Sequence, residues 1–189
     1  MNIESYCSSV SIRMAESAVG KCRMRAAAVL CALLTAYPVL VAADVPVTIN
    51  AGLSDAWYDP QTAGQGFFIT VLPELESIFL AWFTFDTERP SANVTTELGE
   101  PGHRWLTAFG DYSGGSAVLE VELTSGGIFA AAQPAPVQAP AYGTITLEFS
   151  GCNRLELAYE LPALPRSGVI ELQRISDEKV ALCEELSSP

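Results

Sequence analysis

Residues 52–86 constrain the fold of this 189-residue chain more than any other stretch, because they are the densest in Trp, Phe and Tyr. The stretch holds two aromatic-rich segments, residues 67–72 and 77–85, that predict β-strands. Pro60 and Gly64 predict a turn before the first of them, since Pro fixes φ and Gly accepts a positive φ. The hydrophobic core is therefore expected to form around this stretch.

The segment at residues 77–85 is apolar on both of the faces that a strand presents. One face carries Phe79 and Phe83, and the other carries Leu80 and Trp82. Because the core of a small barrel takes up one face of each strand, the remaining face is expected to line a ligand cavity or to meet a partner. The face around Leu80 and Trp82 is the first place where a partner is expected.

Turn-forming residues interrupt the rest of the sequence roughly every eight to twelve positions, the spacing of an all-β sandwich or barrel. The prolines of residues 133–140 remove backbone donors and predict an extended loop or an edge. Residues 86–103 form the longest expected loop, and the one expected helix lies within residues 177–186. The expected strands are residues 53–58, 67–72, 77–85, 104–110, 116–123, 142–149, 155–161 and 169–175.

These strands predict an all-β fold, an antiparallel meander of about eight strands. The meander is expected to close as a small up-and-down barrel, because closure removes exposed strand edges. A two-sheet β-sandwich is the alternative. The expected organisation is a leader at residues 1–43, a lead-in at 44–51, the β domain at 52–175 and a C-terminal tail at 176–189.

The leader has the composition of a signal peptide. Residues 26–43 form an apolar run that follows three basic residues within positions 21–25 and ends in Val41-Ala42-Ala43. These features predict cleavage after the last of these alanines and a mature chain that is periplasmic or secreted. An uncleaved membrane anchor is the alternative, which the small residues at the end of the run disfavour. Met24 begins a more typical leader than Met1.

The body that remains is strongly acidic. Residues 44–189 carry 20 acidic and six basic residues. Such a body repels phosphate backbones, so a nucleic-acid partner is not expected. Glu120 and Glu122 lie on the outward face of an expected strand, which argues against a barrel embedded in the membrane after signal cleavage. Cys152 and Cys183, an even pair in an exported chain, predict a disulfide that ties the tail back.

Two motifs carry a resemblance to a known family. They are Trp57-Tyr58-Asp59-Pro60 with Gly64-Gln65-Gly66, and the later run Trp82-Phe83-Thr84-Phe85-Asp86. The chain resembles a family of uncharacterised bacterial exported β domains with the patterns W-[WY]-[ND]-P…G-x-G and W-F-T-[YF]-D, and the likeness covers nearly all of residues 44–189. It implies a β fold and an extracytoplasmic location, and it supplies no activity. Gln65 and the cysteine pair depart from the pattern.

A second resemblance is to avidin- and lipocalin-type barrels, whose first strand opens with a similar Gly and Trp. Here the equivalent positions are Gly52 and Trp57-Tyr58. The resemblance implies that the indole of Trp57 closes the floor of a barrel.

No recognisable catalytic set is present in the sequence. Residues 110–115 are similar to the nucleophile segment of trypsin-like proteases, but Tyr112 shifts the serine out of register, and a turn explains the glycines better. His103 has no second histidine or free cysteine to work with in residues 44–189. Glu120 and Glu122 are expected on a solvated face rather than in a glycosidase pair or a calcium site. Neither a metal site nor a cofactor is expected.

The expected function is therefore that of a non-enzymatic exported binding or interaction module of the bacterial cell envelope. Its partner would be an envelope protein, a glycan or a small apolar ligand. A small β-barrel carrier of an apolar small molecule is the alternative, and an uncharacterised hydrolase is the third. An open cavity lined by Trp82 favours the carrier, whereas an exposed aromatic patch favours the partner module. The candidate ligand or partner surface is Trp57, Tyr58, Phe67, Leu80, Trp82 and Trp105.

Overall fold

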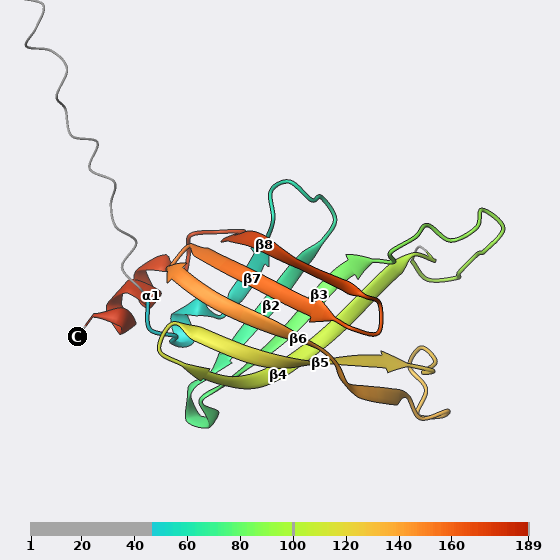
Figure 1. Cartoon of the computed structure of the whole chain (residues 1–189), viewed down its shortest axis with the longest axis horizontal. Coiled ribbons are helices and arrows are strands. Elements are labelled where there is room, and N and C mark those ends of the chain that lie inside the picture. The colour runs from blue at the N-terminus through green and yellow to red at the C-terminus, as the bar shows by residue number, and fades with distance from the viewer. Residues whose placement is uncertain (1–46, 100, 189) are drawn as a thin grey trace, which may run out of the picture. The chain divides into compact units, whose positions relative to one another are not determined.

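The structure, a computed structural model, describes residues 47–99 and 101–188 and is a closed barrel of eight antiparallel strands (Figure 1). Each strand pairs with the next along the chain, and β8 pairs with β1. The barrel rather than the sandwich is therefore confirmed, whereas the leader and its cleavage site lie outside the described residues. The strands are β1 (Asp55–Tyr58), β2 (Gly66–Leu72), β3 (Ser77–Phe85), β4 (His103–Ser113), β5 (Ser116–Ser125), β6 (Val137–Gly151), β7 (Arg154–Leu161) and β8 (Arg166–Arg174).

Most differences from the expected strand bounds lie at the strand ends. The first expected strand is divided into a short 3-10 helix, η1 (Ala51–Leu53), followed by β1. Strand β6 begins at Val137, inside the proline-containing segment, and its first residues pair with β5 alone. They therefore form an edge, as the prolines predict. The tail helix, α1 (Val180–Ser187), is shorter than expected.

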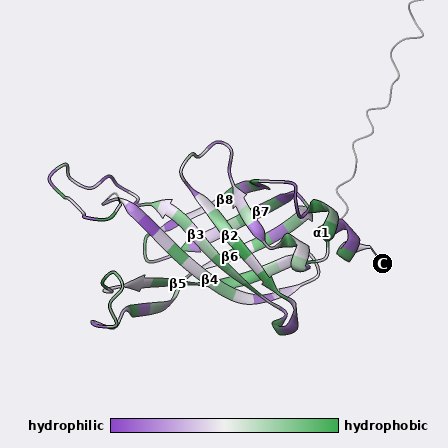
Figure 2. Ribbon diagram, turned by 180° about the vertical axis from the view of Figure 1, so that it is seen from behind, coloured by the Kyte–Doolittle hydropathy of each residue, from purple (hydrophilic) through white to green (hydrophobic). Residues whose placement is uncertain are grey.

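The interior of the barrel follows the alternation of each strand. Along β3 the inward residues are Ile78, Leu80 and Trp82, and the described part of the chain forms one buried apolar cluster from such positions. Figure 2 shows apolar and polar residues alternating along the strands. Burial of this inward face supplies the main favourable term for folding, since apolar area removed from water contributes roughly 25 cal/mol per Å².

The two ends of the barrel differ. The connections β1–β2, β3–β4, β5–β6 and β7–β8 lie at one end, the mouth, beyond which β5 and β6 continue as a two-stranded ribbon (Figure 1). Helix α1 and η1 lie at the opposite end, the floor. Residues 47–50 also lie at the floor, where Ile49 is buried and its N–H donates to the carbonyl of Gly114 at 2.8 Å.

A disulfide attaches α1 to the floor. Cys152, in the β6–β7 turn, is bonded to Cys183 of α1, with their Cα atoms 5.8 Å apart. Gly52 makes the close packing possible, because a Cβ there would lie 2.5 Å from the backbone nitrogen of Cys183. The Gly of the Gly…Trp-Tyr motif is thus required for the contact between η1 and α1.

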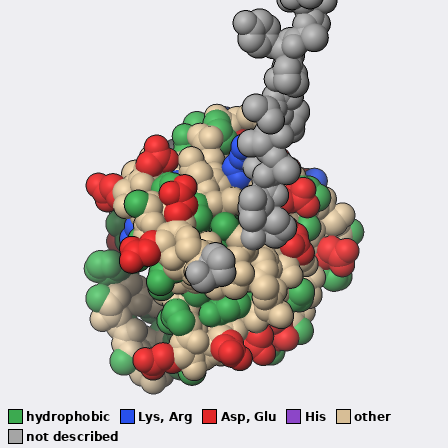
Figure 3. Space-filling model, turned by 90° about the vertical axis from the view of Figure 1, so that its left-hand side faces the viewer, with side chains coloured by type: hydrophobic (Ala, Val, Ile, Leu, Met, Phe, Trp, Pro, Cys, Tyr) green, Lys and Arg blue, Asp and Glu red, His purple; other side chains and the backbone are tan. Residues whose placement is uncertain are grey.

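Figure 3 shows acidic side chains around the margin of the α1 end, where basic side chains are few. Within residues 47–99 and 101–188, no helix has the length and hydropathy needed to cross a membrane.

Candidate functional site: a cavity at the mouth of the barrel

A cavity of about 430 Å³ lies at the mouth of the barrel. Its rim comes from the connecting loops, with Asp59 and Thr62 from β1–β2, Asp86 from β3–β4 and Leu164 from β7–β8. Its walls come from inward-facing residues of the strands. The cavity therefore opens where loops, which tolerate sequence change, meet a rigid scaffold.

Aromatic side chains form one part of the wall. Phe67 stacks on Trp82 with ring centroids 5.1 Å apart, and Tyr159 meets the same indole edge-on at 5.3 Å. Such pairs prefer offset or edge-to-face arrangements, and both geometries occur here. Further lining comes from the aliphatic residues Leu106, Leu123, Leu161 and Ile170 and from Tyr142. Trp82 is thus the central side chain of the wall.

A glycine gives Tyr159 its position. Gly168 of β8 pairs with Tyr159 of β7, and a Cβ on that glycine would lie 2.7 Å from the Tyr159 hydroxyl oxygen. The ring therefore lies over the backbone of β8 in space that any side chain at position 168 would take. This contact holds the ring beside Trp82 and leaves the rest of the cavity open.

The polar groups of the rim are mostly paired with one another. The Thr84 hydroxyl donates to the side-chain oxygen of Gln65. Arg104 bonds Asp86 at 2.6 Å and also donates to the carbonyls of Pro101 and His103. Because the Arg104 and Asp86 side chains are 45% and 37% exposed, this ion pair orders the rim but contributes little stability.

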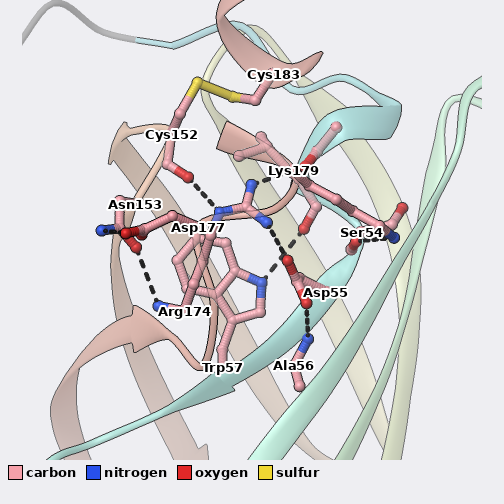
Figure 4. Close-up of polar contacts among 12 residues, drawn as sticks. Ser54, Asp55, Ala56, Trp57, Cys152, Asn153, Arg174, Asp177, Lys179 and Cys183 are labelled. Carbon is pink, nitrogen blue, oxygen red and sulfur yellow. Dashed lines mark hydrogen bonds and ion pairs between the residues drawn. A yellow bond between two sulfur atoms is a disulfide. The ribbon is translucent and has the colours of Figure 1, made fainter. Parts of the chain in front are cut away.

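The floor of the barrel, by contrast, is filled and closed by Arg174 (Figure 4). The guanidinium lies over the Trp57 ring, 4.7 Å from its centroid, and donates to Asp55 at 2.6 Å. It also donates to the carbonyls of Gly52 and Cys152. The Trp57 indole N–H donates to the Leu53 carbonyl at 3.3 Å, so the polar atoms of this cluster have partners although both side chains are buried.

The charge at the floor is structural. Burial lowers the pKa of Arg174, and the hydrogen bond and negative charge of Asp55 oppose this effect, with Asp177 adding to the opposition. An arginine stays charged in proteins, so the guanidinium remains a cation enclosed by acceptors and an indole face. We therefore assign the floor to fold closure, and the open cavity lies at the mouth.

The outside of β2, β3 and β4 carries a second aromatic group. Phe79 pairs with Phe109 across β3 and β4, Phe83 pairs with Trp105, and Phe68 contacts Phe83 edge-on at 5.7 Å. All five residues are 40–56% exposed. Large exposed apolar patches are uncommon on monomeric proteins and mark interaction sites. We call these five residues the outer aromatic face.

The residues expected to form one ligand or partner surface are separated by the barrel wall. Phe67 and Trp82 line the cavity, while Leu80 and Trp57 are fully buried. Trp105 belongs to the outer aromatic face, as described above. Tyr58 lies on β1, where its hydroxyl accepts a hydrogen bond from Gln173 at 2.9 Å.

The expectation of a partner at the face around Leu80 and Trp82 is therefore wrong. That face points into the barrel, where Leu80 has no exposed surface and Trp82 is 8% exposed. The other face of β3, with Phe79 and Phe83, is the exposed one. Both faces are apolar, and closure of the barrel decides which of them becomes the interior.

The residues weighed for catalysis lie apart from the cavity or in structural positions. Ser113 is the last residue of β4, beside the turn at Gly114. His103 is the first residue of β4, and the centroid of its ring lies 5.5 Å from that of Phe85. Glu120 accepts a hydrogen bond from the backbone N–H of Ala141 at 2.9 Å, which supports an irregularity in β6. Among the described residues, no group of three or more His, Cys, Asp or Glu side chains could hold a metal ion.

Sequence reasoning missed four of the polar and amphipathic residues of the cavity, namely Arg104, Tyr142, Tyr159 and Arg166. A signal for Arg166 existed in the alternation of β8, since Arg166, Ile170 and Leu172 share one face. Together these residues give a pocket with an aromatic wall, an aliphatic wall and donor groups near its opening. No family model, curated protein or solved structure matches this chain.

Proposed function

We propose that this chain is a non-enzymatic, exported binding barrel that holds an apolar small molecule in its mouth cavity. The observation that carries the proposal is an open cavity of about 430 Å³ with Trp82 at the centre of its wall, above a filled floor. Small-molecule sites are typically concave, largely apolar and about 300–1,000 Å³ in volume, with a few placed polar groups.

The chemistry of the lining supports binding over catalysis. Among the described residues that line the cavity there is no Ser, Cys, His or Lys. Its two carboxylates already have partners, Asp86 in Arg104 and Asp59 in the backbone N–H of Gln61. The aromatic pairs instead offer flat apolar surfaces for a ring or an alkyl chain. The closed floor also supports the proposal, because a rigid base holds the wall residues in place.

The cavity is tested with N-phenylnaphthylamine, an uncharged probe whose fluorescence rises when it leaves water. We expect the mature protein to bind it and Ile170→Trp to raise its dissociation constant about tenfold or more, since an added indole fills the cavity. Val169→Trp is the matched control, because Val169 is the adjacent residue on β8 and is 60% exposed. It is expected to bind as the wild type does.

Folding of each variant is checked from its thermal midpoint, and Leu123→Phe serves as a milder cavity-filling change. Binding that is absent from the wild type, or that folded Ile170→Trp and Leu123→Phe leave unaltered, would contradict the cavity as the binding site.

The outer aromatic face favours a second candidate function, association with a second copy of the chain. With about half of a ~200 Å² aromatic residue exposed at each of five positions, the rings present roughly 500 Å². A standard interface takes roughly 800 Å² from each partner, so the rings and their borders suffice for a weak dimer. Two-fold homodimers are also the commonest assemblies of soluble proteins.

Sedimentation at increasing protein concentration tests this association. We expect a dimer with a micromolar dissociation constant that tightens with added salt, because salt screens the repulsion between two acidic chains. Trp105→Ser combined with Phe83→Ser is expected to give a monomer, and Val169→Ser to leave the dimer intact. A wild-type chain that stays monomeric at high concentration and high salt would exclude this second function.

A further inference from the structure

Three hydrogen-bond donors face the mouth cavity from adjacent strands. Tyr142 lies on β6, Tyr159 on β7 and Arg166 on β8, and all three line the cavity. Within the part of the chain that the structure describes, the two phenol oxygens form no hydrogen bond. The guanidinium of Arg166 likewise forms no hydrogen bond or ion pair there. The wall formed by β6, β7 and β8 thus presents donors without partners.

Strand register brings two of these donors to neighbouring inward positions. Arg166 pairs with Leu161 at the mouth end of β7 and β8, and Gly168 pairs with Tyr159 two residues deeper. Because residues two apart on a strand share a face, Arg166 follows the glycine that holds the Tyr159 ring. The guanidinium is therefore the next group toward the opening above the Trp82–Tyr159 pair.

The carboxylates of the lining and the Gln65 and Thr84 side chains already have partners. Asp86 is paired with Arg104, and Gln65 accepts from Thr84. Asp59 accepts the backbone N–H of Gln61 at 2.8 Å. The groups that remain available to a ligand on the β6–β8 wall can all donate a hydrogen bond, and one of them carries a positive charge.

We propose that the ligand of the mouth cavity is an amphipathic organic anion, with a flat apolar body and one carboxylate or sulfonate group. This inference rests on the proposed function. The apolar body lies against Phe67 and Trp82, and the anionic oxygens accept hydrogen bonds from Arg166 and from the Tyr159 hydroxyl. A guanidinium suits this group because its planar donors match the oxygens of a carboxylate or sulfonate, and charge-assisted bonds are the stronger kind.

The negative net charge of residues 44–189 opposes the binding of an anion. Residues 44–189 contain six basic and 20 acidic residues, so an organic anion is repelled by the protein as a whole. Two of the six basic residues, Arg104 and Arg166, line the mouth cavity. A preference for an anion over an uncharged molecule of the same shape therefore requires a local cation.

Two probes with the same ring system test the inference on the mature protein. N-phenylnaphthylamine is uncharged, and anilinonaphthalene sulfonate is its sulfonated analogue. We expect the wild type to bind the sulfonate about tenfold more tightly, and Arg166→Gln to remove this preference while changing the affinity for the uncharged probe less than about twofold. Tyr159→Phe, which keeps the ring, is expected to raise the dissociation constant of the sulfonate about threefold.

Arg89→Gln is the matched control, since Arg89 is exposed, carries the same charge and does not line this cavity. It is expected to keep the preference, and thermal midpoints show that each variant is folded. If the wild type binds both probes equally, or if folded Arg166→Gln keeps the preference, the inference is wrong while the cavity remains a binding site. If neither probe binds, or if Ile170→Trp leaves both unaffected, the proposed function itself fails.

Discussion

Replacing Arg174 with methionine is expected to lower the free energy of unfolding by about 3 kcal/mol or more, as measured by urea denaturation followed by near-UV circular dichroism. The Arg174 side chain has no exposed surface, and Asp55 is 16% exposed. Without the guanidinium, the Asp55 carboxylate and the carbonyls of Gly52 and Cys152 lose a charged donor in a nearly dry site. Methionine replaces the aliphatic part of the side chain but not the guanidinium. The loss therefore combines the polar network with the contact that the guanidinium makes with the Trp57 ring.

The matched control is Arg166→Met at the other end of the same strand, where the side chain is exposed and makes no such network among the described residues. It is expected to change the unfolding free energy by less than about 0.5 kcal/mol. Arg174→Met combined with Asp55→Leu is expected to recover part of the loss, because no carboxylate is then left unpaired. A loss below about 1 kcal/mol for Arg174→Met alone would show that water replaces the guanidinium.

The Arg174 cluster also explains how the barrel closes. Strands β1 and β8 share only two register pairs, Trp57 with Arg174 and Tyr58 with Gln173. This is the shortest seam of the barrel, and the guanidinium bonds across it to Asp55 of β1. Variants of the cluster are therefore expected to loosen the seam between β1 and β8 before the rest of the sheet, since the other strand pairs have longer registers.

Local signals in the sequence account for much of this fold. The bounds of β3 are those expected, because aromatic density, alternation and the turn at Pro73 define both of its ends. The sequence favours a barrel without excluding a sandwich, since the choice depends on the pairing of β1 with β8, two segments more than 100 residues apart in the sequence. Alternation specifies the faces of a strand and does not specify its most distant partner.

The candidate site was less predictable, for related reasons. Phe67 and Trp82 were selected because they are aromatic, but so were Trp57 and Trp105, which lie in the floor and on the outside. Composition cannot separate these positions, since both faces of β3 are apolar and burial depends on the direction in which the sheet curls. Arg166 was missed because the last strand was expected to begin at residue 169, three residues later than it does.

Removing the disulfide is expected to lower the free energy of unfolding by about 3–4 kcal/mol, measured on Cys152→Ala/Cys183→Ala against the oxidised wild type. The cysteines are 31 residues apart, and the loop that they close contains all of β7 and β8. In the chain-entropy account, the crosslink restricts the unfolded chain over this whole loop. The effect is therefore expected on global unfolding and not only on the release of α1.

Hydrogen exchange distinguishes these two outcomes. If the crosslink acts globally, amides of β7 and β8 lose as much protection in the variant as those of β3. If it only fastens the tail, α1 alone exchanges faster and the global stability stays within about 1 kcal/mol, which contradicts the prediction. Because Cys183 has no exposed surface and lies at the floor, binding of N-phenylnaphthylamine at the mouth is expected to be unchanged while the variant is folded. A variant that unfolds more readily yet binds the probe equally well would show that the floor contributes to stability separately from probe binding at the mouth.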